Sequence, residues 1–370
     1  MGKERLFFQL LRVAIGRREV FDDNPSINQW EELFSSAKKQ ALIGVCFSAI
    51  EKLPAEQRPS KELLMQWWAI TQQIEKQNTL LNHRTIQVWE SFAREGFRAI
   101  ILKGQGNARW YPNPLRRQSG DIDVWVTKGR KPFDLDVSRA EILSYVKSRF
   151  PVERADLKHI HYPIFTDVAV EVHFQPGIIR GWRRNRKLQD FFTEEMSKCP
   201  DVKLDDDKES YHVVTIPSPN MNAVYLLVHL FDHFMYEGVG MRQVLDYYYF
   251  LLHDFDNINK EYICKTLKNI HLLHFCGAVM WILKDVFCLD DLYLIAKPDK
   301  ARGTLLLNEI IAGGNFGQYD DRLWKAEDSR WNFYWRRTKR QLRFFRYYPV
   351  EVISTPLFLA YQRLWIKGHN

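Results

Sequence analysis

The sequence predicts an α+β protein in which a small mixed β-sheet is flanked by an N-terminal and a C-terminal helical region. Apolar residues recur at helical spacing over residues 1–96 and again over residues 218–370, whereas residues 97–217 carry the period-two alternation of strands. The 370 residues are 46% hydrophobic and 14% aromatic, which is enough for a packed interior and excludes a disordered chain. We therefore expect three regions with these boundaries.

Residues 1–96 are expected to form helices only. The longest helix is predicted from Lys61 to Glu95, where apolar and aromatic residues recur three or four positions apart. Gly96 follows as a C-terminal cap. We expect this long helix to form a wall that packs on the region that follows.

The period changes at Arg98, where short strands replace the long helices. Ser138 and Glu141 form a capping box, which predicts a helix that ends near Phe150. The strands on either side of that helix are predicted at residues 99–102, 120–126, 161–165 and 168–174, and the last two are joined by a turn. Strands in this arrangement are typical of a small mixed sheet.

Helical spacing returns near residue 218, and two pairs of polar residues stand out in the helices that follow. His229 and His233 lie four positions apart, which is a spacing that can bind zinc, but the lack of further ligands favours structural histidines. Arg242 and Asp246 can pair along one helix, or can line a cleft. The sequence leaves the roles of these four residues open.

The composition limits the cellular location and the redox chemistry. No apolar run reaches the roughly 20 residues that a membrane-spanning helix needs. The basic start of the chain is not followed by the cleavage site of a secretory signal, so we expect a cytoplasmic protein. The five cysteines are odd in number, widely spaced and never arranged as Cys-x-x-Cys, which favours reduced core thiols over a metal site.

Lys and Arg outnumber Asp and Glu by 53 to 45, which gives a net charge of +8. This surplus suits nucleotides, nucleic acid or an acidic surface and does not distinguish among them. One basic cluster lies at Arg180–Lys187, and in another, from Trp331 to Tyr348, cations alternate with aromatic residues and no acid is present. The second cluster could form a helix that contacts an anionic surface; a core-packed helix with a solvated basic face is the alternative.

Two aspartates mark the most informative stretch of the chain. Asp121 and Asp123 lie two positions apart in an otherwise apolar strand, so both side chains are expected on one face. Neighbouring carboxylates repel each other unless a cation lies between them. The spacing therefore indicates a metal site, whereas a solvated edge strand with this spacing by chance is the alternative.

A single glutamate interrupts the apolar strand predicted at residues 168–174. The valines and Phe174 share one face of this strand, whereas Ala169, Glu171 and His173 share the other. A lone Glu171 in such a run must face either solvent or a site.

These motifs resemble the signature of the nucleotidyltransferase (DNA polymerase beta-like) superfamily, and in particular an uncharacterised bacterial branch of it. The resemblance extends from about Arg98 to His173 and rests on Ile-Leu-Lys-Gly followed by Arg-x-x-Gly-Asp-Ile-Asp. It implies that Asp121, Asp123 and Glu171 are the catalytic carboxylates and that they bind Mg²⁺ or Mn²⁺.

The resemblance also implies a phosphate-binding loop between the first two strands. Its glycines would let backbone amides approach a phosphate, and Gln105 departs from the Gly-Gly or Gly-Ser that the family more often shows. The nearest cations that could contact a triphosphate belong to the same stretch. The nucleotide-binding residues expected on this basis are Lys103, Gly104, Gln105, Gly106, Arg117 and Gly120.

The function implied by the resemblance is metal-dependent transfer of a nucleoside monophosphate from a nucleoside triphosphate, such as ATP, to a hydroxyl group, with release of pyrophosphate. The acceptor could be a small molecule, an RNA or a protein. The sequence does not identify the acceptor, the preferred nucleotide or the oligomeric state. The alternative is a catalytically silent module that binds a nucleotide or an RNA on the same fold. Retention of three carboxylates argues against that alternative, because a binding module has less use for metal ligands.

Overall fold

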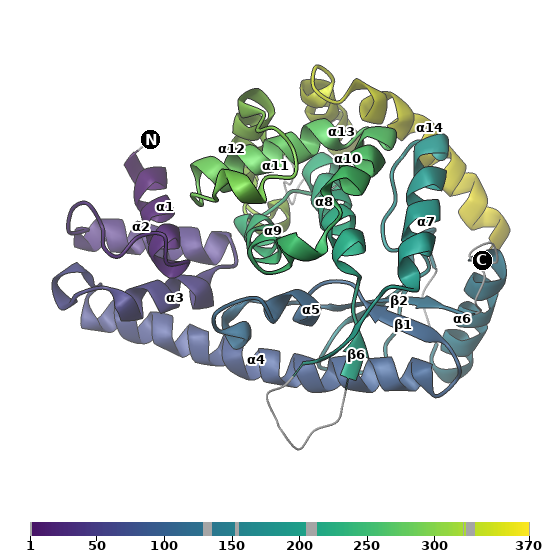
Figure 1. Ribbon diagram of the computed structural model, residues 1–370, viewed down its shortest axis with the longest axis horizontal. Coiled ribbons are helices and arrows are strands. Elements are labelled where there is room, and N and C mark those ends of the chain that lie inside the picture. The colour runs from purple at the N-terminus through teal and green to yellow at the C-terminus, as the bar shows by residue number, and fades with distance from the viewer. Residues whose placement is uncertain are drawn as a thin grey trace.

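The computed structural model describes residues 2–128, 135–151, 155–204, 213–320, 322 and 330–369. It confirms the α+β class, because a small mixed sheet lies among helices that precede and follow it in the chain (Figure 1). The two chain ends lie toward opposite ends of the long axis (Figure 1). Within the described ranges, no helix is both long and apolar enough to cross a membrane.

The N-terminal region is helical, as predicted, and its last helix is much the longest. The helices are α1 (Gly2–Ala14), α2 (Ile27–Lys39), α3 (Ile43–Lys52) and α4 (Lys61–Ala93). The first half of α4 contributes Trp67 and Ile74 to a core shared with α1, α2 and α3, and its second half contributes Ile86 and Phe92 to the core of the sheet. This 33-residue helix, about 50 Å long, therefore connects two hydrophobic cores.

The main sheet has the strand order β1-β2-β4-β3. Its strands are β1 (Arg98–Ile101), β2 (Ile122–Thr127), β3 (His159–His161) and β4 (Val170–His173). β1 runs antiparallel to β2, β2 runs parallel to β4, and β3 runs antiparallel to β4, so the sheet is mixed. A separate pair of strands, β5 (Asp201–Lys203) and β6 (Val213–Thr215), precedes the C-terminal helices.

Two local predictions in this region were wrong. The third strand ends at His161 and does not extend to residue 165, because the N–H of Ile164 bonds back to the carbonyl of Tyr162 at 2.8 Å in a tight turn and not across to the neighbouring strand. Ser138 does not cap a helix, since it lies inside α6 (Leu135–Arg149). Its hydroxyl instead donates to the backbone carbonyl of Lys128 at 2.8 Å, which fixes the end of β2 against α6.

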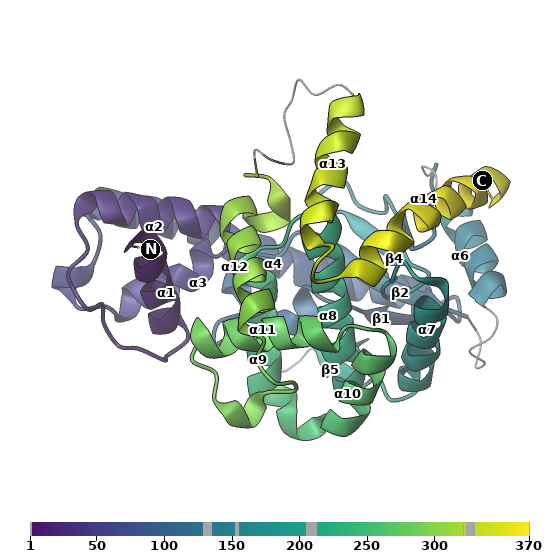
Figure 2. The ribbon, with the colours of Figure 1, turned by 90° about the horizontal axis from the view of Figure 1, so that it is seen from above.

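The C-terminal region is helical, and its first helix starts where the sequence predicted. Ser218 caps this helix, because its Oγ accepts a hydrogen bond from the N–H of Met221 at 3.1 Å. The helices from the sheet onward are α7 (Trp182–Met196), α8 (Pro219–Tyr236), α9 (Met241–Asp254), α10 (Lys260–Asn269), α11 (Leu273–Asp285), α12 (Lys300–Gly313), α13 (Arg330–Phe344) and α14 (Pro349–His369). In Figure 2, α14 extends from the end of α13 toward α6, where Arg139 lies 4.3 Å from the ring centroid of Trp365.

The N-terminal and C-terminal helices contact each other directly. Arg12 in α1 donates to the carbonyl of Val286 at 2.8 Å, and Gln40 after α2 donates to the carbonyl of Ile310 at 2.9 Å. Most of the buried apolar residues of both regions belong to one continuous core. The predicted limits at residues 96 and 217 thus separate stretches of different secondary structure, and they remain predictions as domain boundaries.

Candidate active site

Five polar side chains share one face of the main sheet. The register pairs Asp123 of β2 with Glu171 of β4, and Glu171 with His161 of β3. One pleat further along, His173 pairs with His159. Because residues at paired positions point to the same face, the sheet itself brings two carboxylates and three imidazoles together.

Asp123 is buried, with an exposed fraction of 3%. Its Oδ2 lies 2.9 Å from the Nζ of Lys103, and its Oδ1 accepts a hydrogen bond from the Nε2 of His173 at 2.8 Å. Burial would raise the pKa of Asp123, but Lys103 and His173 hold it well below its usual range. The carboxylate is therefore ionised and held on both oxygens.

Asp121 lies immediately before β2 and faces the same ammonium group. The Nζ of Lys103 is 3.7 Å from Asp121 Oδ1, so one cation lies between the two aspartates. The charge of Asp123, together with burial, raises the pKa of Asp121 above its ordinary value. Burial lowers the pKa of Lys103, but the two aspartates outweigh this effect and raise it overall.

Glu171 lies next to Asp123, and its two oxygens face different partners. Oε2 is 3.5 Å from His173 Nε2, whereas Oε1 is 3.8 Å from His159 Nε2. Burial would raise the pKa of Glu171, but the interaction with His173 lowers it to about 2. Burial likewise lowers the pKa of His173, and its hydrogen bonds to Asp123 and Glu171 outweigh burial and raise it.

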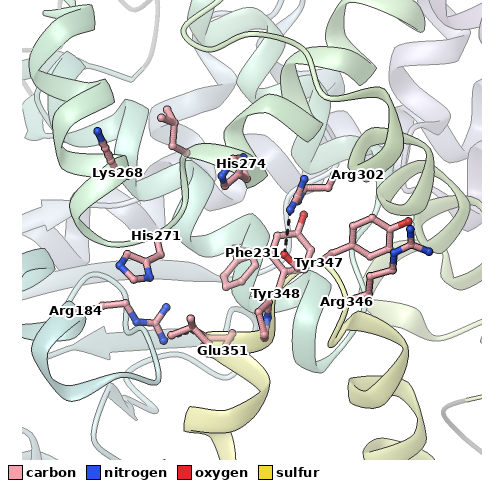
Figure 3. A pocket seen from close by; sticks show the side chains of 13 residues that line it. Arg184, Phe231, Lys268, His271, His274, Arg302, Arg346, Tyr347, Tyr348 and Glu351 are labelled. Carbon is pink, nitrogen blue, oxygen red and sulfur yellow. Dashed lines mark hydrogen bonds and ion pairs between the residues drawn. The ribbon is translucent and has the colours of Figure 1, made fainter.

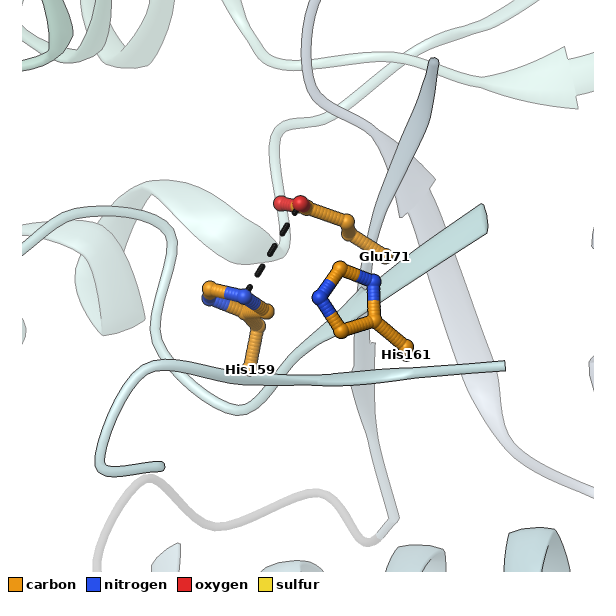
Figure 4. Close-up of side chains that lie close together, drawn as sticks. All are labelled: His159, His161 and Glu171. Carbon is orange, nitrogen blue, oxygen red and sulfur yellow. Dashed lines mark ion pairs between the residues drawn. The ribbon is translucent and has the colours of Figure 1, made fainter. Parts of the chain in front are cut away.

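The histidines were not singled out from the sequence as site residues. His173 carried a usable signal, because it lies two positions after Glu171 on the same strand face. His159 and His161 carried a weaker signal, a His-x-His repeat with the period of a strand. Figure 4 shows the rings of His159 and His161 beside the carboxylate of Glu171. The two histidines lie on β3, which pairs with the strand that carries Glu171.

The glycine loop follows β1 and leads into the short helix α5 (Gln105–Ala108). Gly104 has a φ of +60°, which favours glycine, and a Cβ there would lie 3.6 Å from the carbonyl of Asp121. Gly106 packs more tightly, since a Cβ would lie 3.3 Å from the side chain of Ile216. Gln105 points away from the carboxylates, because its amide donates to Asn82 and to the carbonyl of Asn78 in α4.

Arg117 is enclosed by partners of its own. Its Nε and one terminal nitrogen donate to the two carboxylate oxygens of Asp246, both at 2.7 Å, and its other terminal nitrogen donates to Ser119 at 2.7 Å. Tyr111 also donates to Asp246 at 2.7 Å. Arg242 does not pair with Asp246 along α9, as the spacing suggested; it donates to the carbonyl of Gln118 instead.

A small cavity lies between the glycine loop and α8 and α9. It is lined by Lys103, Gly104, Arg117, Gly120, Asp121, Leu226, His229, Arg242, Gln243, Asp246 and Phe316. Its volume of about 20 Å³ can hold a water molecule but not a nucleoside triphosphate. A nucleotide would therefore have to displace side chains from this cleft.

The pair His229 and His233 shows no metal-site geometry. Their rings pack edge to face, with the ring centroids 4.4 Å apart. The Nδ1 of His233 lies 2.8 Å from the carboxylate of Glu237. Burial and the charge of Lys103 hold the pKa of His229 well below its usual value. Among the described residues, no group of three metal-ligating side chains includes either of them, in line with the structural interpretation.

A larger cavity of about 730 Å³ lies in the C-terminal region (Figure 3). Its charged lining residues are Arg184, Lys268, Arg302, Arg346 and Glu351, and Glu351 accepts a hydrogen bond from Arg184 at 2.8 Å. Phe231 of α8 lines this larger cavity, whereas His229 of the same helix lines the small one. Residues two positions apart point to different sides of a helix, so the two cavities border different faces of α8. The larger cavity contains none of the residues predicted to bind a nucleotide or a metal.

Comparison with known protein families agrees with the motifs. The family model for an uncharacterised nucleotidyltransferase matches residues 26–288, which include the whole main sheet, the glycine loop and the helices that line the small cavity. None of the curated proteins matches the chain. Because the family model covers well over half of its length, the chain belongs to the uncharacterised nucleotidyltransferase family.

Proposed function

We propose that the protein transfers a nucleoside monophosphate from a nucleoside triphosphate, such as ATP, to a hydroxyl group and releases pyrophosphate. The observation that carries this proposal is the position of the Lys103 ammonium between Asp121 and Asp123, with Glu171 paired beside Asp123. Carboxylates gathered on one face of a sheet repel one another unless cations lie between them. Membership of a nucleotidyltransferase family supports the same reaction class.

The residues present fit a divalent cation such as Mg²⁺ or Mn²⁺. Hard cations prefer carboxylate oxygens, and Asp123 and Glu171 have lowered pKa values, so both offer ionised oxygens at neutral pH. Asp121, Asp123 and Glu171 would hold the ion. Once bound, Mg²⁺ would neutralise phosphate charge and polarise the reacting phosphate.

We expect Lys103 to have different partners in the metal-free and the metal-bound protein. Without a divalent cation, its ammonium neutralises the two aspartates, as the distances of 2.9 and 3.7 Å indicate. We propose that it binds a phosphate of the nucleotide when a metal ion takes over the carboxylates, because an ammonium on a flexible stem can move between such partners.

Glu171 suits the role of a ligand better than that of a general base. A carboxylate with a pKa of about 2 holds a proton poorly at neutral pH. In the transfer itself, the acceptor oxygen forms a bond to the α-phosphorus. The bond between the α-phosphorus and the oxygen that it shares with the β-phosphorus breaks, and pyrophosphate leaves. The proton of the acceptor hydroxyl would pass to solvent, while Lys103 positions a phosphate and the carboxylates hold the metal ion.

The second candidate function is a silent module that binds a nucleotide or an RNA. The position of the Lys103 ammonium favours this candidate, because it already neutralises Asp121 and Asp123 without a metal ion. Binding without turnover across a broad panel of acceptors would support it.

We also propose that α13 and the turn after it contact an anionic surface. Lys339, Arg343 and Arg346 are exposed there, together with Leu342 and Phe345. Arg340 differs, because it is buried and donates to the carbonyl of Phe234 at 2.8 Å. Exposed cations beside exposed apolar side chains suit the surface of a bilayer with anionic lipids.

The transfer reaction can be tested by pyrophosphate release. Each of the common nucleoside triphosphates would be incubated with the protein, Mg²⁺ or Mn²⁺, and small-molecule, RNA and protein acceptors. We expect release with at least one combination, and its loss in the double variant Asp121→Asn with Asp123→Asn. Pyrophosphate release that persists in the double variant would contradict the assignment of the reaction to this site.

A further inference from the structure

The strand β3 brings two histidines to the side of Glu171 that faces away from Lys103. We propose that His159, His161 and Glu171 form a binding site for a divalent transition-metal ion, such as Zn²⁺, Mn²⁺, Fe²⁺ or Co²⁺. The link of this ion to nucleotidyl transfer rests on the proposed function, whereas the binding site itself does not.

The strand register explains why these side chains meet. His161 lies directly opposite Glu171 in the antiparallel pair, and His159 lies two positions earlier on the same strand face. Side chains at opposed positions have Cβ atoms about 5 Å apart, and diagonal neighbours are within reach of long side chains. Glu171 uses that reach, since its Oε1 lies 3.8 Å from the Nε2 of His159 (Figure 4).

The three ligand atoms are already close to the geometry of a metal site. One nitrogen from each histidine and one oxygen from Glu171 all lie within 4.8 Å of one another. Ligands of a tetrahedral ion with bonds of about 2.0–2.1 Å lie about 3.3 Å apart, so small rotations of the side chains would complete the site. His161 is exposed, which gives its ring room to rotate and gives the ion a path from solvent.

A carboxylate lies behind one of the imidazoles. The Nδ1 of His159 is buried and makes no hydrogen bond to the described residues, and the Oδ2 of Asp156 lies 3.7 Å from it. The other oxygen of Asp156 is fixed by the backbone N–H groups of Lys158 and His159, both at 2.7 Å. A carboxylate placed at the far nitrogen of a metal-binding histidine orients the ring in many metalloproteins.

The donor set indicates the class of metal. Mg²⁺ prefers oxygen ligands, whereas imidazole suits Zn²⁺, Fe²⁺ and related transition-metal ions. Two nitrogens and one carboxylate oxygen therefore favour a transition metal at this position. Three protein ligands also leave at least one coordination position free for water or a substrate.

Glu171 would connect this ion to the site around Asp123. Its Oε1 faces His159, whereas its Oε2 faces His173, which donates to Asp123. A carboxylate whose two oxygens face different partners can bridge two metal ions at the roughly 3.5–4 Å separation of two-metal enzymes. The ion bound by the histidines would lie on the β3 side of Glu171, and the site around Asp123 lies on the β2 side.

The site can be tested by metal binding alone, without any turnover. The full chain, without a tag and freed of metal by a chelator, would be titrated with Co²⁺ and followed by visible absorption, and with Zn²⁺ in competition with a chromophoric chelator. We expect one tight equivalent, at least tenfold weaker binding in His161→Ala, and about ten- to hundredfold weaker binding in Asp156→Asn. His83→Ala is the control, because His83 is also exposed and lies on α4.

The outcomes separate this site from the proposed function. Wild-type protein that binds no Co²⁺ or Zn²⁺, or His161→Ala that binds with unchanged affinity and spectrum, would overturn the histidine site. Asp121 is not one of its ligands, so Asp121→Asn is expected to retain the Co²⁺ spectrum. Retained Co²⁺ binding without nucleotidyl transfer in the wild type would count against the proposed function and leave the metal site standing.

Discussion

Lys103 is the residue on which the charge balance of the site depends. Its ammonium is the only cation shown within 4 Å of both Asp121 and Asp123 in the described part of the chain. The side chain of Asp123 is 2% exposed, so its charge has little access to solvent. Removal of the ammonium would leave a buried carboxylate with His173 as its remaining partner.

We expect Lys103→Gln to lower the free energy of unfolding of the metal-free protein by about 3–5 kcal/mol, because breaking a buried pair leaves a charge uncompensated. Mg²⁺ is expected to restore part of this loss, since it can replace the ammonium. Urea unfolding with a chelator and with Mg²⁺ measures both effects. Lys128→Gln is the control, because the ion pair of Lys128 with Glu141 joins two side chains that are each 43% exposed. Equal losses in the two variants would contradict the account.

Arg117 and Asp246 form the other buried ion pair of the cleft, with both side chains at most 6% exposed. The pair ties the loop before β2 to α9, and Tyr111 adds a hydrogen bond to the same carboxylate. We expect Asp246→Asn to destabilise the protein by about 3 kcal/mol in urea unfolding, since it removes the charge that Arg117 requires. Asp232→Asn on α8 is the control, and an equally large loss there would show that the pair has no special role.

At the scale of elements, α4 positions the loop that precedes the aspartates. Asn78 lies in the middle of this helix, and its amide donates to the carbonyls of Leu115 and Arg117, both at 2.7 Å. These bonds hold a stretch without regular strand structure against a rigid helix. The loop therefore depends on a residue that lies far from it in sequence.

We expect Asn78→Ala to cost about 2 kcal/mol of stability, because two carbonyls would lose their buried donor. Nucleotide affinity is expected to fall as well, since Arg117 and Gly120 line the small cavity that follows this loop. Urea unfolding and equilibrium binding of a labelled nucleotide measure the two effects. The neighbouring Thr79→Ala, at an exposed position, should change neither, and an unchanged Asn78→Ala would contradict this role.

The elements of the site were largely predictable from sequence, and their pairing was not. Alternation placed Glu171 and His173 on one face, and the structure has them there. The contribution of β3 could not be predicted, because the partner of a strand and its register depend on tertiary contacts. Gln105 was expected in the phosphate loop, but whether its side chain turns to the site or to Asn82 depends on where α4 passes.

At the scale of the whole molecule, the net charge is concentrated in the last two helices. Residues 330–370 hold 9 Lys and Arg and 1 Asp or Glu, so the remaining chain has 53 − 9 = 44 cations and 45 − 1 = 44 acids. The whole surplus of +8 therefore belongs to this segment. On α14, Ile353, Leu357 and Leu364 are at least 60% exposed, which adds apolar surface beside the charge.

We expect the protein to sediment with vesicles that contain anionic lipids and to remain free of neutral vesicles. Reversing three exposed charges, in Lys339→Glu with Arg343→Glu and Arg346→Glu, should reduce binding at least tenfold, because each basic residue near such a surface contributes about 1 kcal/mol. The matched control reverses the exposed Lys61, Lys76 and Lys260. An equal loss of vesicle binding in both triple variants would show that binding depends on net charge alone, and would contradict a specific binding surface.

The overall class was predictable because the change from helical to strand periodicity is strong at residue 98 and again near residue 218. The contact between the two helical regions was not, since it joins residues such as Arg12 and Val286 that carry no mutual signal in sequence. The same holds for the small cavity, which collects residues from the glycine loop, α8 and α9. Long-range packing thus decides how the predicted parts meet.

The central claim is that the site around Asp123 transfers the nucleotidyl group and not the terminal phosphate. It is tested most directly with two preparations of one nucleoside triphosphate, labelled at the α-phosphate or at the γ-phosphate, in the presence of Mg²⁺ or Mn²⁺ and an acceptor panel. We expect α-label, but no γ-label, to become bound to an acceptor, and this transfer to disappear in Asp123→Asn. Transfer of γ-label, or transfer of α-label that persists in Asp123→Asn, would contradict the account.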